Sequence, residues 1–547
     1  MLKLHRQRLR DAFVALSLAN LCFLDPWVRL LGMNSWRSFF RHEPPSRLDL
    51  ICLPLMVLIA AGTFWLLKVL AQRFLSSFGL DFVRVGFLFV LLTPLNAIRL
   101  ELPSARYTSS IIKWIFDRGG APGILLGTDT VLVLLVLIFL RWGRGLCRVA
   151  VPAMLILAPF ALVTFAQAGW LLLTYDSSFA HYRESSARPV SQARHRAGPR
   201  VVWLLFDEMD RGAVRRKDPA AIRLPSLDRL RDESLYSSQA YSPTFCTHLT
   251  LPSYMLGRAV KKLKPLSPSD AELTFSDGAD ARWSDQQNIF GQAHQAGLRV
   301  GVVGWYLPYC RLLGGDVDYC WWGSIYGYTG RSGQTVQTNL MDHAWTAADT
   351  APFMDLLLER VDTLEQCIQS IDAYQDILSR AEQLAANPSF DLVFVHFPVP
   401  HPPGFFRRDV GRFDCSGDYL DNYGLVETAL AGVRKAMEAS GTWQNSALLV
   451  TSDHPYRPWL WGGMPLRPND SKTPDVNRMY RLVPFIVRLP SSDKTLRYTR
   501  RFSTVIVHDL VWALLQGQIA NQAQLVAWLD RHVAEVDELA VPISACQ

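Results

Sequence analysis

Three apolar stretches of this sequence end on side chains that commonly bind metal ions. The stretches read RVVWLLF, LVFVHF and ALLVTS, and each contains or is followed by acidic or imidazole groups. These groups are Asp207, Glu208, His396, His401, Asp453 and His454. Because open α/β sheets place their sites at the carboxyl ends of strands, the pattern predicts a metal-dependent catalytic site at one edge of a sheet.

Two adjacent pairs among these groups are the expected metal ligands. They are Asp207, Glu208, Asp453 and His454. A mixed set of carboxylate and imidazole ligands suits zinc, with Mn²⁺ and Ca²⁺ as the alternatives. A surface Asp-Glu pair can arise by chance, but it rarely ends so apolar a strand, so the metal interpretation is favoured.

Apolar residues are concentrated before residue 176, although 49% of all 547 residues are hydrophobic. Five apolar runs cover residues 12–31, 48–67, 82–98, 124–140 and 149–173. A membrane-spanning helix needs about 20 such residues, so the sequence predicts about five spans. Asp25-Pro26 breaks the first run, which leaves an interfacial helix as its alternative. The net charge of +7 follows no single face, so we expect no nucleic-acid partner.

Basic residues predict the orientation of these spans. Four of them precede residue 11, and three more lie in an expected tight loop at 141–148. With five spans both groups fall on one side, which the positive-inside rule makes cytoplasmic. We therefore expect a transmembrane domain at 1–175, a linker at 176–199 and a catalytic domain at 200–547. That domain would lie in the periplasm or at the cell surface, anchored to the inner membrane.

The cysteines agree with an oxidising compartment for the outer domain. Cys310 and Cys320 flank a short loop that contains Gly-Gly, and they are the expected disulfide pair. Disulfides form and persist outside the cytoplasm. The sequence lacks a CxxC motif, so a structural zinc site is not expected.

The outer region alternates expected strands with expected helices. The strands are 201–206, 299–303, 392–396, 448–450 and 484–487. The helices are 227–235, 289–296, 353–385, 425–439 and 505–515. Such alternation predicts an α/β fold with a mainly parallel sheet covered by helices.

Several short motifs resemble the alkaline phosphatase superfamily, which includes sulfatases, nucleotide pyrophosphatases, phosphoethanolamine transferases and lipoteichoic acid synthases. They are LPSLDRL from Leu224, AYSPT from Ala240, TSDH from Thr451, LVPFIVR from Leu482 and HDL from His508. The resemblance covers about residues 200–517. Five spans followed by such a domain also resemble the layout of phosphoethanolamine transferases and lipoteichoic acid synthases, which extends the resemblance to the whole chain.

The resemblance implies a nucleophile near Thr247, and two threonines compete. Thr247 precedes Pro252 by five residues, as in the transferases, whereas Thr250 precedes it by two, as in the pyrophosphatases. Thr247 is favoured, and the other threonine would be a helix-capping hydroxyl. Sulfatases that make formylglycine need Cys-x-Pro-x-Arg, but Cys246 is followed by Thr247-His248. Cys246 is therefore expected to be packed or disulfide-bonded.

His396 and His401 have the spacing of the transferases' two-histidine motif. The resemblance implies that His401 binds a phosphoryl oxygen or a second metal, while His396 could be only a strand-end histidine. Transferases carry a further His after the Asp-His pair, but here Arg457 follows, and it could supply the missing positive charge.

Three functions remain open from the sequence. The first is a membrane-bound transferase that moves a phospho-headgroup, such as phosphoethanolamine or glycerol phosphate, from a donor lipid to an envelope lipid or glycan through a phospho-threonine. The second is a hydrolase of phosphate or sulfate esters, and the third is a non-catalytic envelope scaffold.

Overall fold

The computed structural model describes residues 2–32, 39–40, 45–101, 105–175, 184–186, 198–211, 223–323, 335–351, 354–457, 461, 482–490, 492 and 494–533. Contacts divide the chain into two compact units. The helical unit contains Met1–Met33, Pro44–Phe179 and Tyr328–Thr363. The sheet unit contains Asn34–Glu43, Ala180–Gly327 and Leu364–Gln547.

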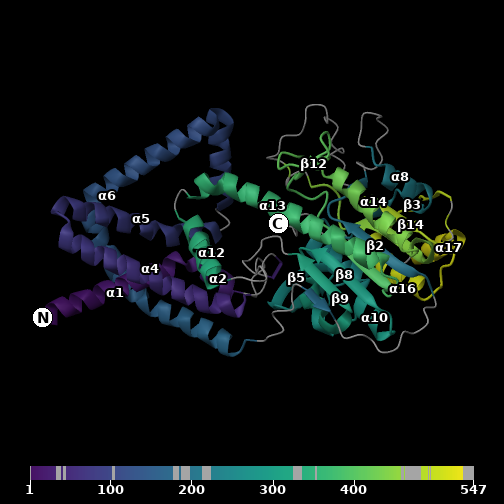
Figure 1. Ribbon diagram of the computed structural model, residues 1–547, viewed down its shortest axis with the longest axis horizontal. Coiled ribbons are helices and arrows are strands. Elements are labelled where there is room, and N and C mark those ends of the chain that lie inside the picture. Colours follow the sequence, from purple (N-terminus) through teal and green to yellow (C-terminus); the bar gives the residue numbers. More distant parts are fainter. Residues whose placement is uncertain are drawn as a thin grey trace. The chain divides into compact units, whose positions relative to one another are not determined.

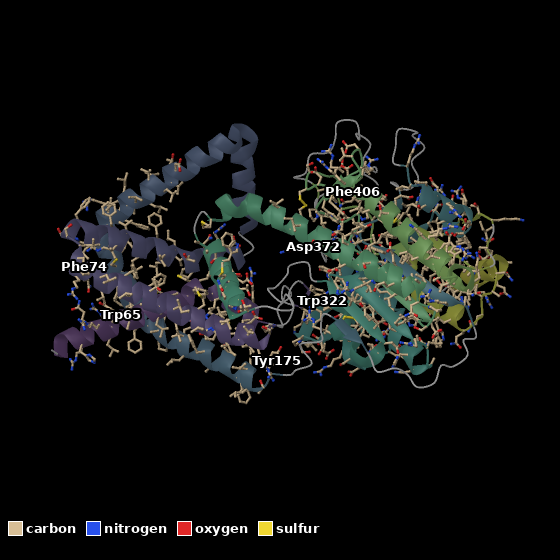
Figure 2. The ribbon with its side chains drawn as sticks, in the orientation of Figure 1. Trp65, Phe74, Tyr175, Trp322, Asp372 and Phe406 are labelled. Atoms are coloured by element: carbon tan, nitrogen blue, oxygen red, sulfur yellow. A yellow bond between two sulfur atoms is a disulfide. The ribbon has the colours of Figure 1, made fainter. Side chains whose placement is uncertain are left out.

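The helical unit consists of long apolar helices (Figure 1). They are α1 (Leu2–Cys22), α4 (Arg47–Phe74), α5 (Ser77–Glu101) and α6 (Ala105–Leu173), together with the shorter α2 (Leu24–Leu31) and α12 (Val336–Asp349). Figure 2 shows that most side-chain atoms drawn on this unit are carbon, including those of Trp65 and Phe74 on α4. Apolar side chains that face outward in this way are typical of helices surrounded by lipid.

Among the described residues, three helices are long and apolar enough to cross a membrane: Arg47–Phe74, Ser77–Arg99 and Asp129–Leu173. The bent pair His5–Cys22 and Leu24–Leu31 makes a fourth if it counts as one span. The five expected spans are thus represented by three or four candidates.

The bend between α1 and α2 is 62°. It falls just before Asp25-Pro26 rather than at this dipeptide, because Pro26 lies in the first turn of α2, where a missing N–H costs nothing.

The tight loop expected at 141–148 is instead helical. α6 continues through these residues, and its candidate span is 45 residues long, more than twice the length of about 20 needed for one crossing. Gly143 and Gly145 lower helix propensity by only about 1 kcal/mol each, and no proline interrupts the segment. Figure 1 shows the ribbon of α6 changing direction along its length.

The sheet unit is built on a nine-stranded sheet in the order β1-β9-β8-β10-β2-β13-β14-β3-β15. The strands are β1 (Glu184–Ser186), β2 (Arg200–Phe206), β3 (Leu235–Ser237), β8 (Val300–Trp305), β9 (Tyr319–Gly323), β10 (Leu392–Phe397), β13 (Ser446–Ser452), β14 (Phe485–Arg488) and β15 (Leu496–Tyr498). Five of the eight neighbouring pairs are parallel. The predicted mainly parallel α/β fold is confirmed.

Smaller strands complete the unit. β5 (Val260–Ser267), β6 (Asp270–Phe275) and β7 (Asp280–Arg282) form a three-stranded sheet, and two further pairs are β11 (Phe406–Arg407) with β12 (Arg412–Phe413) and β4 (Ala240–Tyr241) with β16 (Phe502–Ser503).

Helices cover both faces of the large sheet (Figure 1). α9 (Thr247–Leu256), α10 (Ile289–Gln295) and α16 (Val507–Leu515) pack on one face, and α8 (Pro225–Asp232), α13 (Met354–Ala386) and α14 (Tyr423–Ala439) on the other. Alternate residues of β2 enter the two cores: Trp203 joins the first and Leu204 the second. A strand buried on both faces reads as a continuous apolar run, which explains RVVWLLF.

Part of the expected linker belongs to the sheet. Residues 184–186 form β1, which pairs with β9 in antiparallel orientation at the edge. Residues 176–183 and 187–197 of the expected linker lie outside the described residues, and 198–199 lead directly into β2.

The expected disulfide Cys310–Cys320 is confirmed, and Cys367–Cys415 is a second one. Cys246 is also disulfide-bonded.

Arg200 fixes the start of β2 at the end far from the predicted site. Its buried guanidinium donates to the carbonyls of Leu384, Ala385 and Phe390, at 2.5–2.7 Å. Two of these carbonyls end α13, where unpaired acceptors and the helix dipole both favour a cation. One side chain therefore fixes the central strand relative to α13.

We expect Arg200→Met to lower the free energy of unfolding by about 2–4 kcal/mol, because it leaves several buried carbonyls without a donor. Thermal unfolding of the full chain, followed by tryptophan fluorescence, measures the loss. Arg229→Met is the matched control, since Arg229 is 61% exposed. Equal midpoints for the two variants would contradict the anchoring role.

Candidate metal centre

The pairing register of three strands places their Asp and His side chains at one edge of the sheet. Phe397 of β10 and Ser452 of β13 both pair with Phe206, the last residue of β2. Asp207 directly follows the end of β2, and Asp453 directly follows the end of β13. His396 is the residue before the last one of β10. The sequence predicted this meeting from the strand patterns alone.

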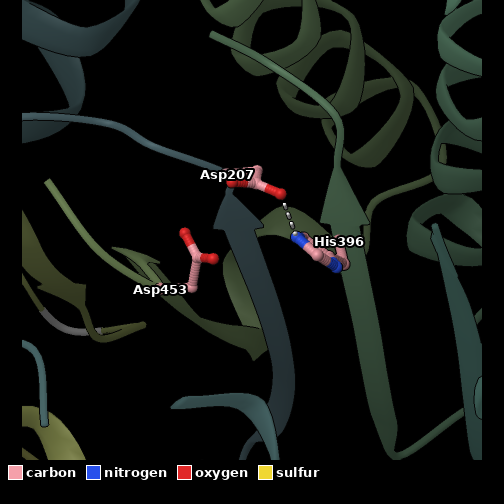
Figure 3. Close-up of side chains that lie close together, drawn as sticks. All are labelled: Asp207, His396 and Asp453. Atoms are coloured by element: carbon pink, nitrogen blue, oxygen red, sulfur yellow. Dashed lines mark ion pairs between the residues drawn. The ribbon is translucent and has the colours of Figure 1, made fainter. Parts of the chain in front are cut away.

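Two overlapping groups have ligand atoms within 4.8 Å of one another. The first is Asp207, His396 and Asp453, and the second is Asp207, Glu208 and His454. Figure 3 shows Asp207 and His396 facing each other from neighbouring strands, with the Asp453 carboxylate beside them. All five residues are buried. Three acids that meet two imidazoles away from water are typical of a site that holds a cation.

Distances within the cluster fit a divalent metal. His454 Nε2 lies 3.3 Å from Asp207 Oδ1 and 3.1 Å from Asp453 Oδ2, and His396 Nε2 lies 3.7 Å from Asp207 Oδ2. Asp207 Oδ1, Asp453 Oδ2 and His396 Nε2 have no hydrogen-bond partner among the residues that the structure describes. Buried polar atoms are rarely left unpaired, so these three atoms fit a metal ligand set.

Hydrogen bonds at the other ends of these side chains hold them in place. Asp453 Oδ1 accepts from the backbone N–H groups of Glu208 and His454, at 3.0 and 2.9 Å, which turns Oδ2 toward the cluster. His454 Nδ1 lies 2.9 Å from the carbonyl of Pro455, and the Tyr309 hydroxyl lies 2.8 Å from His396 Nδ1. The Pro455 carbonyl can only accept, so it places the proton of His454 on Nδ1 and leaves Nε2 for the metal, whereas the Tyr309 hydroxyl holds the ring of His396 in position.

Asp207 and Asp453 differ in the direction in which their pKa values are shifted. Burial alone would raise the pKa of Asp207, but His401, His396 and His454 outweigh it and hold this pKa well below its usual range. Burial, and then the charge of Asp207, raise the pKa of Asp453. Asp207 is therefore the anionic centre of the cluster, and a cation between the two carboxylates would remove their repulsion.

Glu208 stands at the border of the cluster. Its Oε1 accepts from the backbone N–H of Arg457 at 2.6 Å and from Trp461 Nε1 at 3.2 Å, and its Oε2 lies 3.3 Å from the Arg457 guanidinium. Burial still raises the pKa of Glu208 to about 7. Its φ of 67° is uncommon for a non-glycine residue. Its carboxylate thus has two roles open to it: metal ligand and partner of Arg457.

The two candidate threonines occupy different surroundings. Thr247 is the first residue of α9, and its Oγ1 lies 3.1 Å from His454 Nε2. Thr250 is completely buried, and its Oγ1 lies 2.8 Å from Thr244 Oγ1. The structure therefore brings Thr247 to the metal cluster and places Thr250 in a structural hydrogen bond rather than at the expected capping position.

His401 lies beside the cluster rather than within it. Its Nδ1 is 2.6 Å from the carbonyl of Pro402, and its ring packs edge-on against Trp305, with centroids 5.1 Å apart. Burial lowers the pKa of His401 to about 4, so the imidazole is neutral at neutral pH. The Pro402 carbonyl can only accept, so the proton of the neutral imidazole lies on Nδ1, and Nε2 is left to accept a proton or bind a metal.

Sequence reasoning did not single out the aromatic and imidazole groups around the cluster. Phe40, from the short segment between α2 and α4, stacks on Tyr306 with centroids 5.3 Å apart and lies 5.8 Å from His248. Burial, and then Arg457 and His454, lower the pKa of His248 to about 3. No spacing rule in the sequence connects Phe40 with residues more than 200 positions away.

The family of the protein follows from its sequence. A model of the sulfatase family matches residues 199–516, which is more than half of the chain. The chain belongs to the sulfatase family. It is accordingly an enzyme of the alkaline phosphatase superfamily, whose members depend on metal ions. The interpretation as a non-catalytic scaffold is disfavoured. The acidic and imidazole cluster is intact, and it lies within the segment that matches the family.

The chain is also similar, at low identity, to several solved structures. Lipoteichoic acid synthase LtaP from Listeria monocytogenes is 12% identical, with a TM-score of 0.38, covering 60% of this chain and 74% of its own. The PsFucS1 sulfatase from Pseudoalteromonas sp. is 11% identical, with a TM-score of 0.36, covering 58% and 68%. Phosphonate monoester hydrolase of Agrobacterium radiobacter is 12% identical, with a TM-score of 0.33, covering 58% and 77%. No curated protein sequence matches the chain.

We expect Asp453→Asn to lose its bound metal and Glu208→Gln to keep most of it. The first substitution removes a carboxylate whose Oδ2 faces only the cluster, whereas the second removes a charge that Arg457 already pairs. Elemental analysis of the purified proteins after dialysis, with circular dichroism to check the fold, measures the difference. If Glu208→Gln loses as much metal as Asp453→Asn, then Glu208 belongs to the ligand set.

Proposed function

We propose that the protein is a membrane-anchored, metal-dependent transferase. It would move a phospho-headgroup, such as phosphoethanolamine or glycerol phosphate, from a donor lipid to an envelope lipid or glycan. The observation that carries this proposal is the Thr247 hydroxyl, 3.1 Å from His454 Nε2 at the start of α9. A hydroxyl nucleophile suits phosphoryl transfer through a covalent intermediate.

The proposed reaction has two displacements. Thr247 Oγ forms a bond to the phosphorus of the donor as the bond from phosphorus to the diacylglycerol oxygen breaks, and the hydroxyl proton is transferred to the leaving diacylglycerol. An acceptor hydroxyl then attacks the phospho-threonine and restores Thr247. A divalent cation, with zinc as the best fit to the ligand set, supplies a lowered hydroxyl pKa and neutralises phosphoryl charge when bound.

The chain's own residues add to this chemistry. A phosphate oxygen bound beside Thr247 would gain from the backbone N–H groups at the start of α9. Arg457, whose guanidinium pairs with Glu208, adds a positive charge. These groups support an anionic, tetrahedral substrate centre at Thr247.

Sulfate hydrolysis through formylglycine has weaker support. This chemistry needs a free cysteine as its precursor, in Cys-x-Pro-x-Arg. Cys246 is disulfide-bonded and followed by Thr247-His248. The thiol is thus not available for the modification.

The proposed location follows from the helical unit and the disulfides. Three or four candidate spans would anchor the enzyme in the inner membrane, and the disulfides of the sheet unit favour the periplasmic side. A lipid donor would then lie in the leaflet next to the catalytic domain.

We expect Thr247→Ala to lose activity by a factor on the order of 10³ or more, because no other hydroxyl replaces the nucleophile. Thr250→Val, which keeps the shape but loses a buried hydrogen bond, should cost about 1 kcal/mol of stability and little activity. Mass spectrometry of substrate-trapped enzyme should find phosphate on Thr247. Phosphate on Thr250 would overturn this assignment.

Product analysis separates transfer from hydrolysis. Purified enzyme in vesicles that contain a headgroup-labelled donor lipid and an extract of envelope lipids and glycans should release diacylglycerol and place the label on an acceptor. Thr247→Ala is the matched control. Label that appears only as free headgroup phosphate would favour the hydrolase instead.

A further inference from the structure

α12 is an unexpected member of the helical unit. Residues 328–363 lie inside the segment that matches the sulfatase family, yet their contacts group them with the apolar helices. α12 packs against α2 and α4. The catalytic sequence is therefore interrupted by a helix that belongs to the other unit.

Polar residues of α12 face inward. Asn339, His343 and Ala347, at successive spacings of four, are 0%, 3% and 8% exposed. Asn339 Nδ2 donates to Asp49 Oδ1 of α4 at 2.7 Å, and His343 Nε2 lies 3.7 Å from the same oxygen. This polar contact fixes which face of α12 turns toward the helical unit.

Apolar residues of α12 face outward. Met341 is 63% exposed and Trp345 is 51% exposed. They lie about 160° around the helix from the buried face, at about 100° per residue. A helix in water shows the opposite pattern, with apolar residues inside and polar residues outside.

α12 lies at the ends of the apolar helices. Asp49 is the third residue of α4, and Asn96, near the end of α5, donates to the carbonyl of Thr350 at 3.1 Å. Arg47 at the start of α4 covers the ring of Tyr175, just after α6, with 5.1 Å between guanidinium carbon and centroid (Figure 2 labels Tyr175). Arg and Tyr at helix ends are typical of the membrane–water boundary.

We propose that α12 is an interfacial helix whose Met341–Trp345 face enters the headgroup region of the leaflet. Its 14 residues span about 21 Å, which is too short to cross the hydrocarbon core of about 30 Å. On α4, Ile51 and Leu55 are also exposed, at 51% and 40%, on the side of that helix away from Asp49. Lipid fits the exposed apolar faces of both helices.

This inference rests on the proposed membrane anchoring and adds a second contact with the leaflet of the donor lipid. Trp rings prefer the headgroup level of a bilayer, and Met fills the acyl boundary beneath it. The sulfatase-family sequence thereby carries its own lipid-binding element.

Photolabelling tests this placement in the full protein. We would reconstitute it in vesicles of phosphatidylethanolamine and phosphatidylglycerol that contain a lipid with a diazirine near the glycerol backbone, and map adducts by peptide mass spectrometry. Adducts are expected on Met341 or Trp345 and on Ile51 of α4, but not on Val410, which is 54% exposed in the sheet unit.

The outcomes are distinguishable. Adducts on α4 without any on α12 would overturn the inference and leave the membrane anchoring intact. No adducts on either helix would overturn both.

A matched pair of variants tests the face of α12. Trp345→Asp should lower the adduct yield on Met341 at least about fivefold, because a charge draws this face away from the acyl boundary. Val410→Asp adds the same charge at an exposed apolar residue of the sheet unit and should leave the yield within about twofold. Equal losses in the two variants would contradict the proposed face.

Discussion

The parallel register of β10, β2 and β13 determines which side chains meet in this protein. Phe397, Phe206 and Ser452 end their strands at one level, so the residues next to them converge. A slip of one residue in β10 would turn His396 to the opposite face of the sheet, away from Asp207. The buried pairing at the strand starts, including Arg200 with the end of α13, helps to prevent such a slip.

The cluster that this register creates is unfavourable without a cation. Asp207, Glu208 and Asp453 are buried, and buried like charges raise one another's proton affinity. The protein relieves part of this strain by pairing Glu208 with Arg457 and by surrounding Asp207 with three imidazoles. One oxygen each of Asp207 and Asp453 still accepts no hydrogen bond from the described residues, and a divalent metal would complete the compensation of their charge.

Much of the fold and of the site could be predicted from the sequence, because apolar strands that end on Asp or His obey simple rules. The parallel sheet, the disulfide Cys310–Cys320 and the meeting of Asp207 with Asp453 came from such local patterns. Contacts between distant segments were not visible. The position of α12, the pairing of Glu208 with Arg457 and the stacking of Phe40 on Tyr306 depend on tertiary packing, which leaves no periodic signal in the sequence.

The choice between Thr247 and Thr250 shows how a helix start selects a nucleophile. The two residues are three positions apart and so lie on nearly the same side of α9, one turn apart. Thr250 is far enough into the helix to be covered, and it bonds to Thr244, which also accepts from the N–H of Cys246. This small network holds the turn before α9 and leaves Thr247 at its end, next to His454.

A hydroxyl at the first helical position gains from the free N–H groups there, whereas one a turn later does not. The disulfide at Cys246 adds a covalent restraint one residue before Thr247, so its backbone is held from both sides. Spacing in the sequence allowed either register, but only the register of Thr247 places a hydroxyl, helix N–H groups and the metal cluster together.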